Sequence, residues 1–514
     1  MPTQQDTWRA NQAAKQAEDR PFPLKRPLNF APFEAAIHAL APERVAQLDA
    51  FLPAASVADI QRKFADGSLT CAELVAYYVR RIQQHDGHLN AILELNSDAL
   101  RLAQEFDADP QFLAGEKLRG IPILLKDNIA TGDAMHTTAG AAALRDVRFP
   151  RDAFLVARLR EAGAIILGKT NMSEWANFMT NESLNGFSAL GGQTRNPCGP
   201  FDVSGSSSGS GAAMAAHFAA LAIGTETSGS IIAPSTQNGV CGLKPSLGLV
   251  SRDAIIPITD AQDTAGPMTR NMSGLALLFD VICARDPSDP MSFFAGEIQR
   301  PDRLDSEASR SGRWGLTGKQ IGLVRATLER DHDAEMAEKA IRVLQSAGAE
   351  VVDVIITSSS PQSSADVLPV YHAGFLRGVN AWLAQAGAGL TVADVIAFNK
   401  RDLANCAPQG MDLLEKSGAS EMSAADYEAS VLRNRMLCQQ AIRNTLTHYK
   451  VDFLMTMGYG LVFLAACAGF PSLSVPAGLA ASGEPVGLLL VGNYLADWDL
   501  VGAGLAFELK IIAA

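Results

Sequence analysis

Apolar residues recur along this chain at two spacings, one typical of helices and the other of buried strands. Helical spacing predicts two helices between residues 57 and 86. The second opens at Thr70, which stands three positions before Glu73 as in a capping box. Short unbroken apolar runs at 120–126 and 164–167 predict strands that are buried on both faces, as in a parallel sheet. Helices and strands placed in turn in this way predict an α/β fold.

The same alternation continues to the end of the chain. Further helices are predicted at 97–106 and, between the two strands, at 152–162. No internal repeat is visible, so one large domain is favoured over an array of small units. The remaining predicted elements are strands at 321–325, 351–356, 452–455, 472–475 and 487–491 and helices at 332–346, 371–386, 391–402, 423–447 and 497–509.

Polar segments suggest how the chain is divided. Residues 1–45 are polar and interrupted by proline, so we expect an arm that lies extended over the surface or is partly disordered. The predicted division is an N-terminal arm over 1–50 and one domain over 51–514. Charged residues mixed with Ser, Pro and Gly at 286–318 indicate a loop or insertion. Residues 286–450 are expected to be the most variable part and to line the substrate site.

Composition narrows the class of protein. Of the 514 residues, 47% are hydrophobic and 19% charged, as in an ordinary soluble globular enzyme. The formal net charge of -12 argues against non-specific binding to nucleic acid or to an anionic membrane. The N-terminal residues lack the apolar segment of a secretory signal, and no apolar run reaches about 18 residues. We therefore expect a cytoplasmic protein without a membrane-spanning helix.

The cysteines and histidines do not form a metal-binding pattern. Seven cysteines are scattered along the chain without a CxxC pair, and the eight histidines include no HExxH arrangement. An odd number of scattered cysteines is typical of reduced thiols in a reducing compartment. The sequence predicts neither a disulfide framework nor a metal site.

The stretch from Ser204 to Pro245 has an unusual composition. It reads SGSSSGSGAAMAAHFAALAIGTETSGSIIAPSTQNGVCGLKP, in which two Gly/Ser turns flank an apolar segment with the composition of a helix. Gly/Ser runs are most often flexible linkers, but a linker would have polar neighbours, whereas here the apolar segment follows directly. On composition alone an ordered active-site loop and an inert structural loop both stay open.

Two motifs within this stretch resemble the amidase signature family. They are Ser204–Gly211 and the TETSGSI motif at Thr225–Ile231. Within the family, residues 250–270 are most similar to bacterial peptide amidases. The resemblance implies a central mixed, mostly parallel sheet covered by helices on both faces, and a hydrolase that uses a Lys, a cis-Ser and a nucleophilic Ser. Further blocks in the family's order, all within 57–285, are Gly120–Ile129, Ala164–Phe178, Gln193–Pro197, Gly239–Ser246 and Gln262–Asn271.

The resemblance places the three catalytic residues at Lys126, Ser206 and Ser230. Ser230 would attack a carbonyl carbon, and Ser206 would pass its proton to Lys126. Spacing alone does not select this lysine, because Lys126, Lys169 and Lys244 each follow an apolar run and each would have a lowered pKa if buried. A base must be neutral, so activity is expected to rise with pH as the amine loses its proton.

The residues around the two serines are given supporting roles by the same resemblance. Ser206 would follow a cis peptide bond with Gly205, and the Ser207 hydroxyl would either lie near Lys126 or satisfy backbone groups of the loop. The oxyanion would be bound by backbone N–H groups of the second turn. Those groups belong to Thr227, Ser228, Gly229 and Ser230. Ser228 replaces the Gly or Asp that is common in the family.

Other residues have weaker assignments. Asp263 and the adjacent Gln262 resemble a pair that braces the core, although Asp263 could equally cap a turn. Arg195 and Arg252 could hold a substrate carbonyl, but pairing with acids is the more common role of such residues. A substrate pocket could be walled by Trp175, Phe178 and Met179, whose spacing is also typical of core residues.

Several functions remain compatible with these residues. The first is hydrolysis of carboxylic amides, such as C-terminal peptide amides, aryl amides or small amides, without a cofactor. A carbamate (urethane) hydrolase would use the same nucleophile. Alternatives of other classes are a non-catalytic binding protein and a tRNA-dependent amidotransferase subunit. The segment after Gly460 is shorter than is usual in the family, and a monomer or a homodimer is expected.

Overall fold

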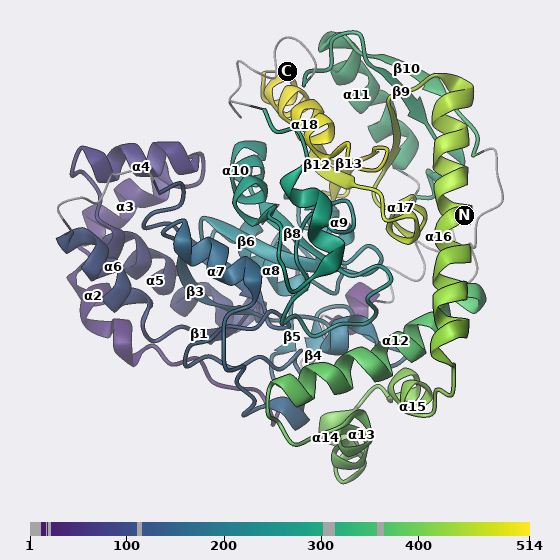
Figure 1. Ribbon diagram of the computed structural model, residues 1–514. Helices are drawn as coiled ribbons and strands as arrows, with labels where there is room; N and C mark the ends of the chain where they lie inside the picture. Colours follow the sequence, from purple (N-terminus) through teal and green to yellow (C-terminus); the bar gives the residue numbers. More distant parts are fainter. Residues whose placement is uncertain are drawn as a thin grey trace.

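Helices cover a long central sheet in the structure, a computed structural model (Figure 1). The structure describes residues 12–16, 18, 22–109, 116–301, 314–330, 332–356 and 364–513. Within these residues the sheet has eleven strands in the order β1-β3-β2-β6-β8-β7-β12-β13-β11-β9-β10. In chain order they are β1 Ile92–Leu95, β2 Pro122–Lys126, β3 Ile165–Thr170, β6 Leu221–Glu226, β7 Cys241–Lys244, β8 Thr264–Thr269, β9 Gln320–Leu323, β10 Glu350–Asp353, β11 Phe453–Met457, β12 Ser472–Leu479 and β13 Pro485–Val491. A separate two-stranded ribbon pairs β4 Phe187–Ser188 with β5 Gly192–Gln193.

The α/β class and the mixed sheet are confirmed, but the sheet is not mostly parallel. Among the described strands, β2 is parallel to β3 and β6, and β9 is parallel to β10 and β11. The other six neighbouring pairs are antiparallel. One reason is that β8 lies between β6 and β7 and runs against both. Another is that residues 480–484 join β12 to β13, which is too short for the crossover that parallel strands need.

Helices lie on both faces of the sheet, as two consecutive residues of β12 demonstrate. Leu473 faces Gly504 of α18 (Asp497–Ile512), whereas Ser474 shares a hydrogen bond of 3.0 Å with Thr236 of α9 (Ile232–Gln237). Successive side chains of a strand point to opposite faces, so α18 and α9 cover opposite sides of the sheet. The long helix α16 runs along one end of the molecule (Figure 1). The α-helices are α2 Glu34–Ala39, α3 Pro42–Phe51, α4 Val57–Ala65, α5 Cys71–Leu89, α6 Ala99–Ala108, α7 Phe154–Glu161, α8 Ser208–Ala215, α9 Ile232–Gln237, α10 Met272–Ile282, α11 Asp333–Ser346, α12 Ser364–Gln385, α13 Val392–Lys400, α14 Leu403–Cys406, α15 Asp412–Gly418, α16 Ala424–Tyr449, α17 Val462–Ala468 and α18 Asp497–Ile512.

The capping box predicted at the start of α5 is present. The Thr70 hydroxyl accepts a hydrogen bond of 3.0 Å from the backbone N–H of Glu73, and the Glu73 carboxylate accepts one of 3.1 Å from the N–H of Thr70. These reciprocal bonds satisfy donors that a helix start leaves open.

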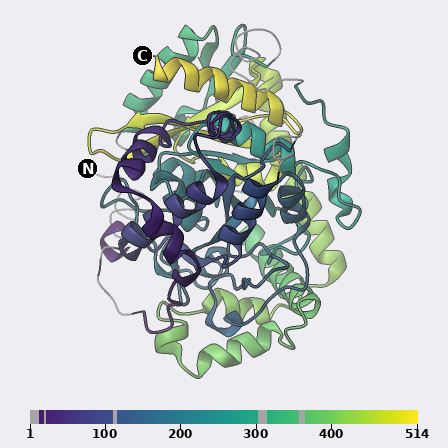
Figure 2. The same ribbon diagram turned by 90° about the vertical axis from the view of Figure 1, so that its left-hand side faces the viewer.

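The N-terminal part differs from the predicted arm. Residues 31–45 are not extended, because the 3-10 helix η1 Ala31–Phe33 is followed by α2 and α3. Phe33 and Leu48 are buried in the same core as the strands, so this part belongs to the main body, where its helices lie in front of the sheet in Figure 2. Residues 12–16 form a short helix, whereas 1–11 lie outside the described residues.

The region 286–450 has two structural parts. Its first part supplies β9, α11 and β10, so residues 320–353 extend the central sheet and do not form a peripheral insertion. Its second part is helical, from α12 to α16. The predicted loop at 286–318 contains the 3-10 helix η4 Pro290–Gly296, and its residues 302–313 lie outside the described part of the chain.

The Gly/Ser-rich stretch is ordered, but its apolar segment is only partly helical. Helix α8 ends at Ala215, and Leu221–Glu226 forms β6 in the centre of the sheet. Residues of β6 pair with β2 on one side and with β8 on the other. Pairing on both sides overrides the helical preference of the Ala- and Leu-rich segment.

Candidate active site

Lys126 is the last residue of β2 and lies at the carboxyl end of a strand, as predicted. Strand β6 is the parallel neighbour of β2, so the carboxyl ends of the two strands lie side by side. The Lys126 side chain is completely buried. Its Nζ donates a hydrogen bond of 2.8 Å to Ser206 Oγ and one of 3.2 Å to the carbonyl oxygen of Thr225.

The surroundings of Lys126 favour its neutral form. Burial lowers the pKa of the Lys126 amine to about 7, and the negative charges of Asp263 and Glu226 oppose this effect without reversing it. A free lysine side chain is almost wholly protonated at neutral pH. The buried amine can therefore exist as a proton acceptor close to neutral pH.

Ser206 and Ser207 fix the first turn against the second. The peptide bond between Gly205 and Ser206 is cis. The backbone N–H of Ser207 donates to the carbonyl oxygen of Ser230 at 3.2 Å. The Ser207 hydroxyl donates to the carbonyl oxygen of Thr225 at 3.0 Å and accepts from the N–H of the same residue at 3.2 Å. Of the two roles predicted for Ser207, the geometry favours the one that satisfies backbone groups.

In the turn from Thr227 to Ser230, three carbonyl groups bind described parts of the protein, whereas the N–H groups do not. The carbonyl oxygens of Thr227, Gly229 and Ser230 accept hydrogen bonds from Gln262, Ala233 and Ser207. Among the described residues, none of the four N–H groups of the turn donates to another protein group. Ser230 is buried except for 8% of its surface. Four N–H groups beside a nearly buried hydroxyl can bind a developing negative charge.

Glu226 holds the residues that follow Ser230. Its Oε2 accepts hydrogen bonds of 2.8 Å and 3.0 Å from the backbone N–H groups of Ile231 and Ile232. These donors belong to the start of α9, where a carboxylate is stabilised by the unpaired N–H groups of a helix. The carboxylate thus fixes the direction in which the chain leaves Ser230.

The backbone of the turn requires a glycine at position 229. Gly229 has a φ of +90°, a conformation that residues with a side chain rarely adopt. A methyl group at this position would also lie 3.1 Å from Cγ2 of Val462 in α17. The short segment after Gly460 therefore lies directly against the turn.

Asp263 and Gln262 brace the same turn from another side. Asp263 accepts a hydrogen bond of 2.6 Å from the Thr227 hydroxyl, and its second oxygen accepts from the N–H groups of Ile258 and Thr259. Burial raises the pKa of the Asp263 carboxyl to about 6. Asp263 thus has both of the roles considered from the sequence. It braces the turn through Thr227, and it caps a turn through the N–H groups of Ile258 and Thr259.

A cavity of about 440 Å³ opens beside the turn. Residues 225–227 form part of its wall, together with an apolar segment at 254–258 and with Ala381 and Trp382 of α12. The residues of the predicted triad do not line it. The cavity therefore adjoins the buried polar residues and can hold the part of a molecule that extends away from them.

Comparison with known proteins gives the family. A family model described as Amidase matches residues 73–457. The chain belongs to the amidase family. It is 33% identical over 464 residues to the Arabidopsis thaliana protein named "Probable amidase", with 88% of this chain and 89% of that protein covered. It is 32% identical over 504 residues to a glutamyl-tRNA(Gln) amidotransferase subunit of Halorhodospira halophila, with 88% and 96% covered.

A solved structure of the family has the same fold. The native peptide amidase of Stenotrophomonas maltophilia superposes with a TM-score of 0.82 at 39% identity, covering 89% of this chain and 97% of that one. The predicted resemblance to amidase signature hydrolases, and to bacterial peptide amidases among them, is confirmed. As a member of this family, the chain is a hydrolase of C–N bonds other than peptide bonds.

The three apolar residues predicted to wall a pocket in this amidase are core residues. Trp175, Phe178 and Met179 are each at most 5% exposed, and none of them lines the cavity. The Phe178 ring packs against Phe375 of α12 with ring centroids 5.6 Å apart. From the same segment, Ala176 does line the cavity.

Lys169 and Lys244, considered from the sequence as possible bases, and Arg195, considered as a substrate contact, have other partners. Lys169 donates to the carbonyl oxygen of Ile129 at 2.6 Å, and Lys244 to that of Pro245 at 3.0 Å. Arg195 donates to the carbonyl oxygen of His88 at 3.2 Å, near the end of α5, and does not line the cavity. All three contacts are structural.

Arg252 lies in the wall of the cavity, but its guanidinium is held by protein groups. It donates to Asp289 with Nε at 3.0 Å and with Nη2 at 2.7 Å, and to the carbonyl oxygen of Asp260 with Nη1 at 2.6 Å. Pairing with acids, the more common of the two predicted roles, is therefore the one observed.

Two residues of the site were not anticipated. Glu226 has the contacts described above, and Asn128 donates to the Thr225 hydroxyl and to the carbonyl oxygen of Ile256, at 3.1 Å in each case. Both residues stand inside blocks that resemble the family, next to predicted catalytic residues. Their position in those blocks was the feature of the sequence from which a role in the site could have been predicted.

Two expected absences can be examined only in the described residues. There, no group of three or more His, Cys, Asp and Glu side chains is arranged to hold a metal ion. In the same residues, no helix combines the length and the apolar character that crossing a membrane requires.

Proposed function

We propose that this amidase cleaves carboxylic amide bonds through an acyl-enzyme on Ser230, with Ser206 as proton relay and Lys126 as base. The observation that carries the proposal is the hydrogen bond of 2.8 Å between Lys126 Nζ and Ser206 Oγ. An amine with a pKa of about 7 that contacts a serine hydroxyl can take a proton from it near neutral pH. The backbone hydrogen bond between Ser207 and Ser230 holds the turn that carries Ser230 against the loop that carries Ser206.

The reaction would run in two stages. Ser230 Oγ forms a bond to the carbonyl carbon, its proton passes to Ser206, and the Ser206 proton passes to Lys126. When the tetrahedral intermediate collapses, the C–N bond breaks and the leaving nitrogen takes a proton back along the same path. Water then attacks the acyl-enzyme and loses its proton through the same pair. The carboxylic acid is released and Ser230 recovers its proton.

The negative charge of the intermediate would be bound by the turn 227–230. Its N–H groups are open to a ligand, because no protein group in the described structure accepts from them. Losing one such donor typically lowers kcat by a factor of about 100 to 1,000. The turn therefore supports an oxyanion role for the backbone of Thr227, Ser228, Gly229 and Ser230.

For the substrate, we propose an uncharged carboxylic amide, with C-terminal peptide amides first and aryl or small amides next. The 39% identity to the Stenotrophomonas maltophilia peptide amidase supports this order. The cavity of about 440 Å³ beside the turn offers room for a side chain or a ring. Carbamates are the alternative within the same chemistry, since the same nucleophile and N–H groups fit their carbonyl.

A role as a tRNA-dependent amidotransferase subunit is the alternative of another class. The 32% identity to the Halorhodospira halophila protein of that class favours it. The net charge of -12 opposes binding to tRNA by this chain alone. We propose instead a cytoplasmic monomer or homodimer that acts without cofactor, nucleic acid or membrane.

A serine-directed fluorophosphonate tests the nucleophile. Labelling is expected in the wild-type protein, absent in Ser230→Ala and strongly slowed in Ser206→Ala. Labelling that persists in Ser230→Ala would remove this residue from the mechanism. Rates on a peptide amide, an anilide and a carbamate, each without ATP or partner proteins, then separate the substrate classes.

A further inference from the structure

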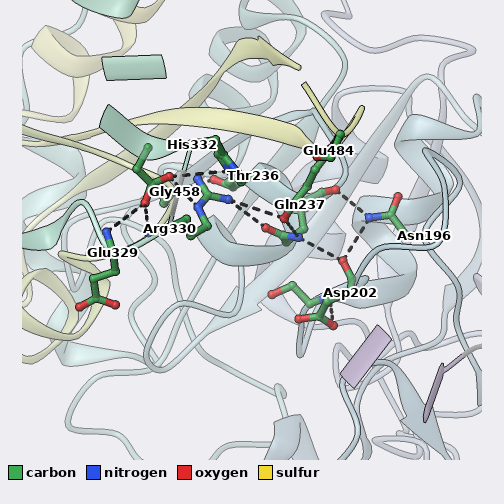
Figure 3. A network of polar contacts seen from close by, with 12 residues as sticks. Asn196, Asp202, Thr236, Gln237, Glu329, Arg330, His332, Gly458 and Glu484 are labelled. Carbon is green, nitrogen blue, oxygen red and sulfur yellow. Dashed lines mark hydrogen bonds and ion pairs between the residues drawn. The ribbon is translucent and has the colours of Figure 1, made fainter. Parts of the chain in front are cut away.

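Asp202 stands four positions before Ser206 and takes part in a buried polar network, of which Figure 3 shows the contacts with Asn196 and Gln237. Its Oδ1 accepts from the backbone N–H of Ser204 at 2.9 Å, and its Oδ2 accepts from Asn185 Nδ2 at 3.1 Å. Its backbone oxygen accepts from Asn196 and Gln237 at 3.1 Å and 3.3 Å. The start of the Ser206 loop is thus held at both the side chain and the main chain of one residue.

Gln16, from the short helix at 12–16, completes this network from the far end of the chain. Its Nε2 donates to Asp202 Oδ1 at 2.7 Å, and its Oε1 accepts from the N–H of Val203 at 3.1 Å. One turn earlier, Gln12 Oε1 accepts from the N–H of Asn185 at 3.3 Å. Both glutamines are buried, whereas Lys15 of the same helix is exposed. The buried face of this helix therefore binds the loop that carries Ser206.

The backbone of the loop before Ser206 has an unfavourable conformation and little free space around it. Ser204 has a φ of +58°, a left-handed backbone conformation that residues with a side chain rarely adopt. Its N–H is the one that Asp202 binds. The next residue, Gly205, is enclosed as well, since a methyl group there would lie 2.4 Å from Ser173 Oγ and 3.3 Å from Asn185 Oδ1. Fixed partners on both sides select one position for the backbone that precedes Ser206.

We propose that Asp202 and Gln16 are positioning residues for Ser206, through which the N-terminal helix keeps the Ser206 hydroxyl in line between the base and the nucleophile. This inference rests on the proposed role of Ser206. Loss of the Gln16 contacts lets the loop sample other positions, so fewer enzyme molecules hold the relay in its reactive geometry. Small displacements of a reacting group have large effects on rate, and we expect kcat to fall roughly 10-fold.

The test compares Gln16→Met, which keeps the side-chain volume but removes both hydrogen bonds, with Lys15→Met on the exposed face of the same helix. Thr391→Ala, which removes the capping box of the distant helix α13, is the control for a general loss of stability. For each variant kcat, KM, Tm and the pH midpoint of the rate are measured. The expected result is a lower kcat in Gln16→Met alone, with KM and the pH midpoint unchanged.

Two results would overturn the inference. One is a wild-type kcat in Gln16→Met. The other is a loss of kcat that Thr391→Ala reproduces at the same decrease in Tm. Ser206→Ala is measured in parallel to separate the two proposals. If Ser206→Ala is inactive while Gln16→Met is normal, only the positioning role fails. If Ser206→Ala is fully active, the proposed function fails with it.

Discussion

The Nζ of Lys126 lies 2.8 Å from the Oγ of Ser206, although 80 positions separate the two residues in the chain. The parallel pairing of β2 with β6 and the return of the chain through the Ser206 loop bring them together. Because the amine is buried, it contacts the hydroxyl without competition from bulk water. This relationship makes the protonation state of Lys126 the main variable of the site.

The rate should rise with pH as Lys126 loses its proton. Burial lowers the pKa of this amine to about 7, so kcat/KM is expected to increase from about pH 5.5 and to level off above about pH 8, with a midpoint near 7. Lys126→Arg should be inactive at every pH, because a guanidinium does not lose its proton in this range. A kcat/KM that stays constant across the range would contradict Lys126 as base.

Glu226→Gln should move that midpoint toward lower pH. The negative charge of Glu226 raises the pKa of Lys126, so its removal lowers the pKa further and the rate rises earlier. The glutamine oxygen can still accept from the N–H groups of Ile231 and Ile232, whereas in Glu226→Ala these donors lose their partner and kcat should fall about 10-fold. Glu94→Gln, a carboxylate that does not act on Lys126, is the control and should leave the midpoint where it is.

Gly229→Ala should lower kcat by about 100-fold, because it disturbs the N–H groups of the turn. The new methyl group meets Val462 in a backbone conformation with φ +90°. Gly67→Ala is a matched control, since Gly67 has a φ of +73° but open space around it. The control should lose about 1 kcal/mol of stability and no activity. Equal loss of kcat in both variants would show that the effect of Gly229→Ala is not local.

Replacing Lys126 by Met should stabilise the protein while abolishing activity. The pKa of Lys126 is lower in the folded state than its usual 10.5, so the unfolded chain binds more protons and buried Lys126 destabilises the fold. This destabilisation is full below about pH 7 and disappears as the pH rises to 10.5. Calorimetry should therefore show a gain of about 1 to 3 kcal/mol near pH 6 and a smaller gain near pH 9. Exposed Lys339→Met should show neither effect.

Ala381→Phe should discriminate between substrates by size. Ala381 lies on the exposed edge of the cavity, and a ring there should raise KM about 10-fold for an anilide or peptide amide and leave a small amide such as acetamide unaffected. Ala384→Phe, on the same helix but away from the cavity, is the matched control. If the KM for the bulky amide does not change in Ala381→Phe, the substrate does not occupy this cavity.

Local patterns were sufficient for many elements of the fold and for the position of Lys126 at the end of a strand. Thr70 and Glu73 predict the start of α5 because a capping box needs only residues three positions apart. The apolar run before Lys126 predicts a buried strand, and Lys126 does lie at its end. The resemblance to a family, and not the spacing, separated Lys126 from Lys169 and Lys244.

Features set by distant parts of the chain could not be predicted. The segment at 221–226 has the composition of a helix but forms a strand, because β2 and β8 pair with it on both sides. The insertion of β8 between β6 and β7, which makes the sheet less parallel than expected, has no local sign. Gln16 and Asp202 meet across 186 positions, and nothing in either segment indicates the contact.

The bonds of Ser207 also restrict how the site can open. Its N–H binds the Ser230 carbonyl oxygen, and its hydroxyl binds both backbone groups of Thr225. Parting Ser206 from Ser230 would break these hydrogen bonds, so we expect the loop and the turn to move together. The cavity beside the turn is bordered by other parts of the chain, the segment at 254–258 and α12. Different residues at 254–258 or in α12 would change which molecules fit the cavity. Lys126, Ser206 and Ser230 would not have to change, because they do not line it.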